Sequence, residues 1–122
     1  FAAQTLRQCR RDCLHHGLSV ERMAPLARHD FRKDMKSLRY LAEFFATLFP
    51  DLSRAPFRDD FRDLQDALGV LNDFEVALSL AKGKRPAQLP PRHARAMQEA
   101  EAIWSRLSDS APAWDEPDQP TR

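Results

Sequence analysis

The sequence predicts an all-α protein folded as an antiparallel four-helix bundle, and three features lead to this prediction. Apolar residues recur every three or four positions over long stretches, which is the period of an amphipathic helix. Prolines stand at the ends of these stretches, where they begin or stop helices. Only three glycines occur among the 122 residues, and the connections between stretches are short. Helices of moderate length with short connections favour a bundle.

The predicted helices span residues 1–16, 25–49, 56–82 and 91–107. The first ends before Gly17, a residue that breaks helical periodicity. The second begins at Pro25 and is stopped by Pro50, because proline suits the first turn of a helix but not its interior.

The third predicted helix begins at Pro56 and ends near Gly83, since glycine is common just after a helix end. Gly69 falls in its interior, where glycine costs about 1 kcal/mol relative to alanine. We expect the close approach of a neighbouring helix to compensate for this cost. Gln65 and Asn72 lie beside the apolar seam, so they are placed to hydrogen bond between helices.

The fourth predicted helix opens at Pro90-Pro91 and ends near Leu107. The segment 109–122 is acidic and rich in proline, a composition that does not support a packed core. We therefore expect one domain over residues 1–108, followed by a tail without regular structure.

The net charge of +1 hides an uneven distribution along the chain. Residues 1–49 hold nine Lys and Arg against five Asp and Glu, whereas residues 50–81 hold three against seven. Residues 82–108 again have an excess of cations, six against two. A nearly neutral protein can thus present a strongly basic surface.

One side of the second predicted helix concentrates these cations. With a rotation of about 100° per residue, a histidine, four cations and a phenol fall on one side of the helix and apolar residues on the other. The stacked cations repel one another unless an anion offsets their charge. We call this side the cationic face, and it consists of His29, Arg32, Lys33, Lys36, Arg39 and Tyr40.

Three arginines of the first helix, Arg7, Arg10 and Arg11, extend this candidate site if that helix packs beside the second. A planar guanidinium group grips phosphate oxygens with two hydrogen bonds. A solvated helix surface explains the three arginines equally well. We expect no cofactor and no metal, because no C-x-x-C pair exists. We interpret Cys9 and Cys13 instead as small residues of the core, which stay reduced in the cytoplasm.

Two segments of the chain also resemble a known family. The run from His29 to Phe45 reads H-D-F-R-K-D-M-K-S-L-R-Y-L-A-E-F-F. It resembles the signature of the CHAD family, the conserved histidine α-helical domain. The second signature of that family resembles the run from Leu64 to Asp73, L-Q-D-A-L-G-V-L-N-D. The resemblance extends to about Trp114 and is weaker over the fourth helix.

The resemblance implies a binding function. CHAD domains bind inorganic polyphosphate through basic residues, often beside triphosphate-handling enzymes or on polyphosphate granules in the cytoplasm. A complete CHAD domain has two related four-helix halves, and this chain resembles the second half alone. A missing N-terminal half, or a second copy in a homodimer, would then complete the binding surface. We expect no membrane partner, because no apolar run is long enough to span a bilayer.

Two other functions remain open. A phosphohydrolase-like enzyme or accessory subunit could use His29 and Asp30, but adjacent residues on a helix diverge by about 100°. No further cluster with ligand spacing supports a metal. A nucleic-acid-binding helical module needs aromatic residues on its basic surface for stacking, and only Tyr40 lies there. We therefore predict non-catalytic binding of polyphosphate.

Overall fold

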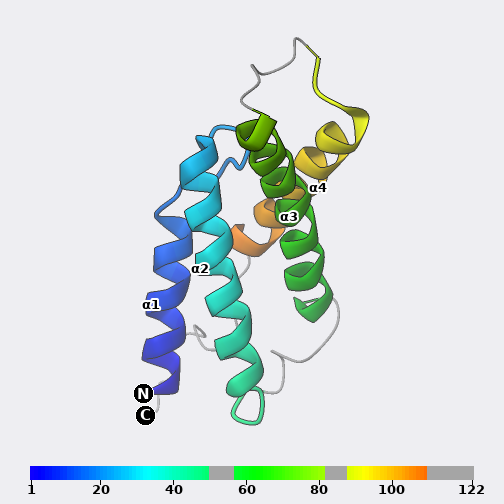
Figure 1. Ribbon diagram of the computed structural model, residues 1–122. Helices are drawn as coiled ribbons and strands as arrows, with labels where there is room; N and C mark the ends of the chain where they lie inside the picture. Colours follow the sequence, from blue (N-terminus) through cyan, green and yellow to red (C-terminus); the bar gives the residue numbers. More distant parts are fainter. Residues whose placement is uncertain (50–56, 82–87, 110–122) are drawn as a thin grey trace.

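The computed structural model describes residues 1–49, 57–81 and 88–109. These residues form four α-helices and no strand, which confirms the predicted all-α bundle. In Figure 1, α1, α2 and α3 follow one another from left to right, and α4 lies partly behind α3. The helices are α1 (Ala2–Leu14), α2 (Pro25–Phe44), α3 (Phe57–Ala81) and α4 (Pro91–Asp109).

Helices α1 and α2 end earlier than the sequence predicts. Helix α1 ends at Leu14, and the chain turns at Gly17, whose φ of 102° lies in the left-handed region that glycine favours. Helix α2 ends at Phe44 rather than at residue 49, and turns follow from Phe45 to Leu48. Phe45 is buried and its ring packs at 84° against that of Phe1, so tertiary packing redirects the chain before Pro50.

Helix α3 begins within one residue of its predicted start, and α4 continues two residues past Leu107, to Asp109. The predictions that rest on Pro50, Pro56 and Gly83, and those for the tail from residue 110 to 122, lie outside the described residues.

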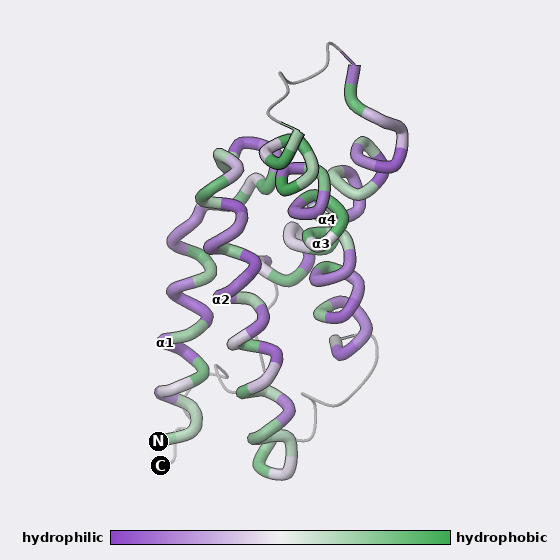
Figure 2. Tube along the Cα trace, viewed as in Figure 1, coloured by the Kyte–Doolittle hydropathy of each residue, from purple (hydrophilic) through white to green (hydrophobic). Residues whose placement is uncertain are grey.

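The core follows the apolar period of the helices, which appears as alternating colours along the chain in Figure 2. Helix α2 packs against α1 and α3, and α3 also packs against α4. Phe31 and Met35 of α2, Leu64 and Leu68 of α3, and Trp104 of α4 are fully buried. The rings of Phe31 and Trp104 meet edge to face with centroids 4.9 Å apart, an arrangement that aromatic pairs prefer.

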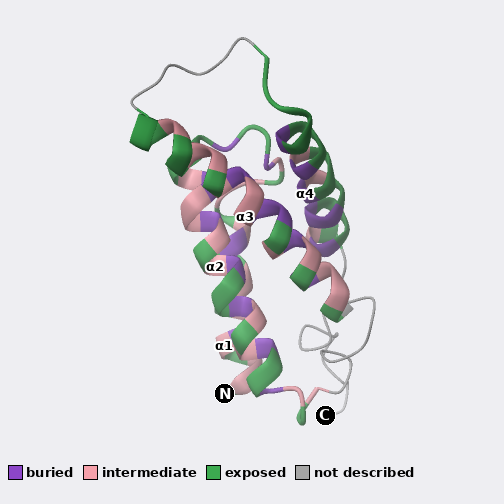
Figure 3. Ribbon diagram, turned by 45° about the vertical axis from the view of Figure 1, so that its right-hand side comes forward, coloured by how far each residue is buried: buried purple, intermediate pink, exposed green. Residues whose placement is uncertain are grey.

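Helix α4 turns its buried side toward the rest of the bundle (Figure 3), and polar contacts fix its position. The indole Nε1 of Trp104 donates a hydrogen bond to the carbonyl oxygen of Gly17 at 3.0 Å. The carboxylate of Glu101 accepts hydrogen bonds from the hydroxyl of Ser19 at 3.3 Å and from the amide of Glu21 at 3.1 Å. The loop that precedes α2 is therefore tied to α4.

The two cysteines are free thiols. Cys13 is buried, and its hydrogen bond with Cys9, together with burial, raises the pKa of its thiol. Cys13 thus stays neutral as a small core residue, in agreement with the sequence prediction.

Candidate functional site

The candidate site lies where the cationic face of α2 meets α3. Nδ1 of His29 lies 3.1 Å from Oδ1 of Asn72, and it carries the hydrogen of this bond because an amide oxygen can only accept. Further along α2, Nη1 of Arg39 donates to Oε1 of Gln65 at 2.6 Å. Residues early in α2 thus meet residues late in α3, as expected for antiparallel neighbours. The predicted bridging role of Gln65 and Asn72 is confirmed.

Arg32 lies between these two contacts, and the end of its side chain faces Gly69 of α3. A Cβ atom built on Gly69 would have Nη2 of Arg32 as its nearest neighbour, at 3.9 Å. We expected a neighbouring helix to approach closely here. That expectation was wrong, because no atom lies closer than 3.9 Å to the added Cβ. The glycine instead faces the end of a long cationic side chain, which reaches across the α2–α3 boundary.

The outer edge of the cationic face is formed by three exposed side chains. Nζ of Lys36 lies 5.8 Å from the centroid of the Tyr40 ring, within the range of a cation–π interaction. Nζ of Lys33 lies 3.7 Å from Oδ1 of Asp30, one turn away on the same helix. Such exposed pairs contribute at most about 1 kcal/mol, so a stronger anion can replace them.

Few carboxylates neutralise the cationic face. Nε of Arg39 pairs with Glu43 at 3.2 Å. Asp34 points away, as its position on the helix predicts, and contacts Nε2 of His16 at 2.7 Å. In the part of the chain that the structure describes, no carboxylate oxygen lies within ion-pair distance of Arg32 or Lys36. The face therefore keeps an excess of positive charge.

The space between α2 and α3 at this face is too small for a compact ligand. A crevice lined by Arg28, His29, Arg32 and Asn72 has a volume of only about 10 Å³. That is the room needed for about one water molecule. A ligand of the cationic face must therefore lie along the surface of the helices.

Two arginines of α1, Arg10 and Arg11, make hydrogen bonds away from the cationic face. Nη2 of Arg10 donates to the carbonyl oxygen of Ser108 at 3.1 Å, at the C-terminal end of α4. Nη2 of Arg11 donates to Oε1 of Gln8 at 2.8 Å, within α1 itself. Arg7 is half-buried on the same helix. The hydrogen bonds of Arg10 and Arg11 tie them to α4 and to α1, so these arginines are not gathered into the row formed by α2.

Sequence reasoning missed one cation of α2. Arg28 is only 7% exposed, and its Nη2 lies 4.0 Å from Oε2 of Glu75 in α3. It precedes Arg32 by four residues, so it falls on the same side of the helix. That spacing was the signal that could have found it.

Comparison with known protein families assigns the chain to a family. The family model of the CHAD domain matches residues 1–82, which is more than half of the chain. The chain belongs to the CHAD domain family. The match ends one residue after α3, so α4 lies outside it, whereas the sequence resemblance was expected to reach about Trp114. Both signature segments fall inside the matched region, and they are the segments that contact one another in this CHAD domain.

CHAD domains are associated with polyphosphate binding. Neither a curated protein nor a solved structure matches this chain. Among the described residues, no helix is long and apolar enough to cross a membrane. Within the same ranges, no three His, Cys, Asp or Glu side chains are grouped so that they could hold a metal ion.

Proposed function

We propose that this CHAD domain binds inorganic polyphosphate along the cationic face of α2 and catalyses no reaction. The observation that carries the proposal is the excess of positive charge at Arg32 and Lys36, in a row that hydrogen bonds to α3 hold in place. From Arg32 to Arg39 this row extends roughly 10 Å along the helix axis.

A linear polyanion suits this surface better than a compact anion does. Polyphosphate carries charge at every unit, so it needs a row of cations rather than an enclosed pocket. Much of its binding free energy would come from the release of counterions, as for nucleic acids. The small volume of the crevice at His29 and Arg32 is consistent with a ligand that lies along the surface.

The contacts of the cationic face favour binding over catalysis. His29 is held by Asn72, whereas the carboxylate of the adjacent Asp30 lies beside Lys33. The two side chains thus have separate partners and do not form an acid–base pair. Binding of single-stranded nucleic acid would need aromatic rings for base stacking. The one aromatic residue of the cationic face, Tyr40, already contacts Lys36 through its ring.

The test is a comparison of binding to long-chain polyphosphate, triphosphate and single-stranded DNA at two salt concentrations. We expect the tightest binding for long-chain polyphosphate, with an affinity that falls as salt rises. The double variant Lys36→Ala/Arg39→Ala should lose about tenfold or more in affinity, since it removes two phosphate contacts.

The matched control is Arg62→Ala/Arg95→Ala, which removes two exposed cations from α3 and α4 instead. This control should bind polyphosphate almost as the parent does, because its cations lie outside the row. Equal affinities of the two double variants would place the site elsewhere. Circular dichroism of both variants checks that the helices are retained.

A further inference from the structure

The two cysteines of α1 form a pair of thiols on one side of the helix. Cys9 and Cys13 are four residues apart, so their side chains lie one above the other on neighbouring turns. Both thiols are free, and they hydrogen bond to one another. Two cysteines on neighbouring turns of one helix rarely reach the geometry of a disulfide, so the pair persists as two adjacent thiols.

The pair lies at the boundary between α1 and α2, and one of its members is open to a groove. Sγ of Cys9 donates to the backbone carbonyl oxygen of Asp34 in α2, at 3.9 Å. Cys9 also lines a groove of about 520 Å³ between α1 and Leu41 of α2. Cys13, one turn further along, is fully buried. A small ion can therefore approach the pair from the groove, on the side of Cys9.

Two sulfur ligands on neighbouring turns suit a soft cation that needs few ligands. Soft thiolate ligands select copper(I), an ion that forms stable complexes with two thiolates in line. Zinc(II) instead takes four ligands at the corners of a tetrahedron. The described residues contain no group of three side chains that could hold a metal ion, so they offer zinc(II) no such site.

We infer that Cys9 and Cys13 bind one copper(I) ion as a two-coordinate dithiolate. Each thiol gives up its proton to solvent and forms one Cu–S bond, and the oxidation state of copper does not change. The product carries one negative charge. Helix α1 has three arginines against one aspartate, and this excess of positive charge favours such a complex. The proposed binding of polyphosphate uses neither cysteine.

A competition titration with copper(I) and the chromogenic chelator ferrozine, under anaerobic conditions, tests the inference. We expect one copper(I) ion per chain, bound at least about a hundredfold more tightly than zinc(II). X-ray absorption at the copper edge should show two sulfur ligands and no nitrogen or oxygen ligand. The inference is wrong if the chain does not compete with the chelator, if zinc(II) binds as tightly, or if nitrogen or oxygen completes the site.

Two variants separate the spacing of the thiols from their number. Cys9→Ser removes one ligand and should weaken copper(I) binding about a hundredfold. Cys9→Ser/Asp12→Cys restores a second thiol at an exposed position, but adjacent residues on a helix diverge by about 100°. This matched control should therefore bind copper(I) as weakly as Cys9→Ser does. If it binds like the parent, the spacing of Cys9 and Cys13 does not form the site, and the inference is wrong.

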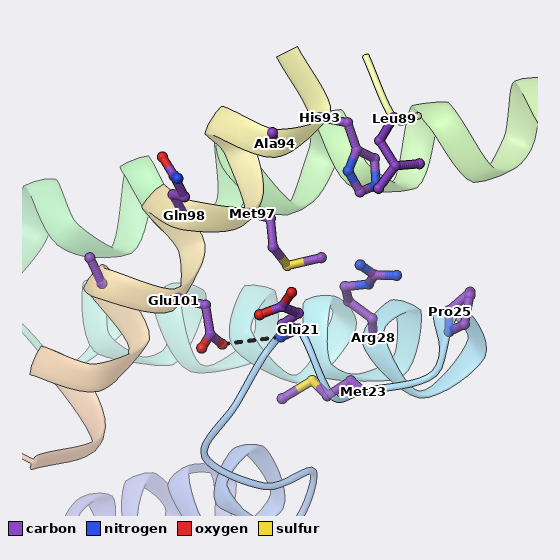
Figure 4. Close-up of a pocket in the computed structure, with 11 residues that line it drawn as sticks. Glu21, Met23, Pro25, Arg28, Leu89, His93, Ala94, Met97, Gln98 and Glu101 are labelled. Atoms are coloured by element: carbon purple, nitrogen blue, oxygen red, sulfur yellow. Dashed lines mark hydrogen bonds between the residues drawn. The ribbon is translucent and has the colours of Figure 1, made fainter. Parts of the chain in front are cut away.

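Methionine sulfur atoms are the other soft ligands of this chain. Met23 and Met97 line a cavity of about 880 Å³ beside α4 and the start of α2, and Figure 4 shows both side chains there. Met23→Leu/Met97→Leu replaces both sulfur atoms with groups of similar volume. The affinity for copper(I) should stay within about twofold of that of the parent. A loss as large as that in Cys9→Ser would move the site to this cavity and refute the inference.

The outcome for copper(I) can be separated from that for polyphosphate. Cys9→Ser should bind polyphosphate as the parent does, and Lys36→Ala/Arg39→Ala should bind copper(I) as the parent does, because the two sites share no residue. Circular dichroism shows whether each variant keeps its helices, and Cys9 is only half-buried, so its replacement by serine should not disturb the core. If either variant keeps its helices but loses both ligands, the two sites are not separate, and the inference is wrong.

Discussion

Two glycines provide a paired test of the fold, because their replacement by alanine should change stability in opposite directions. Gly69 lies in the interior of α3, and an added Cβ would lie 3.9 Å from Nη2 of Arg32, an ordinary contact distance. Alanine should therefore fit without a clash. It should raise the free energy of unfolding by about 0.5–1 kcal/mol, from helix propensity and from a less flexible unfolded chain.

Gly17 has more free space, yet its replacement should destabilise the protein. No atom lies within 4 Å of a Cβ added there, but φ is 102°. A residue with a Cβ pays about 1–2 kcal/mol in the left-handed region, so Gly17→Ala should lower the free energy of unfolding by that amount. At this position the backbone conformation, rather than the available space, decides whether the substitution stabilises or destabilises the protein.

Thermal and urea unfolding followed by circular dichroism measure both effects. For a domain of this size, a change of 1 kcal/mol corresponds to a shift in Tm of roughly 3–5 °C, upward for Gly69→Ala and downward for Gly17→Ala. Gly69→Ala should also keep its affinity for polyphosphate within about twofold, because Arg32 need not move. A loss of stability in Gly69→Ala would refute the reasoning. It would show that Arg32 needs the space that the glycine leaves.

Three further predictions concern the α2–α3 contact, the position of α4 and assembly. Asn72→Ala should weaken polyphosphate binding about fivefold in a titration, since His29 loses the hydrogen bond that holds it, whereas Asp73→Ala, at the exposed neighbouring position, should not. Trp104→Phe should lower the free energy of unfolding by about 1–2 kcal/mol in urea, because the carbonyl of Gly17 loses its donor; an unchanged midpoint would contradict this. Long-chain polyphosphate should bring copies of the domain together, because a ligand that contacts two cationic faces favours the associated form. Sedimentation velocity with and without polyphosphate tests this, and a strict monomer in both conditions would show that one face suffices.

The sequence by itself determined which segments are helical and which side of each helix is apolar. These properties are local, because a period of 3.6 residues and the restrictions on proline act within one segment. The same local rule predicted the cationic face on α2. It also predicted that Asp34 points away from that face, and the contact of Asp34 with His16 confirms this second point. It also placed Gln65 and Asn72 at a helix boundary, where they hydrogen bond to α2.

Only the tertiary structure decided which residues meet across the helices. The sequence could place Gly69 in a helix but could not choose Arg32 as its neighbour, and it gave no partner for Arg28 or Arg10. The cavity beside α4 also depends on segments that are far apart in the chain. Register and crossing angle between helices follow from the packing of all core side chains together, and no single segment contains that information. For the same reason α2 ends where Phe45 enters the core, before the proline that the sequence marks as its stop.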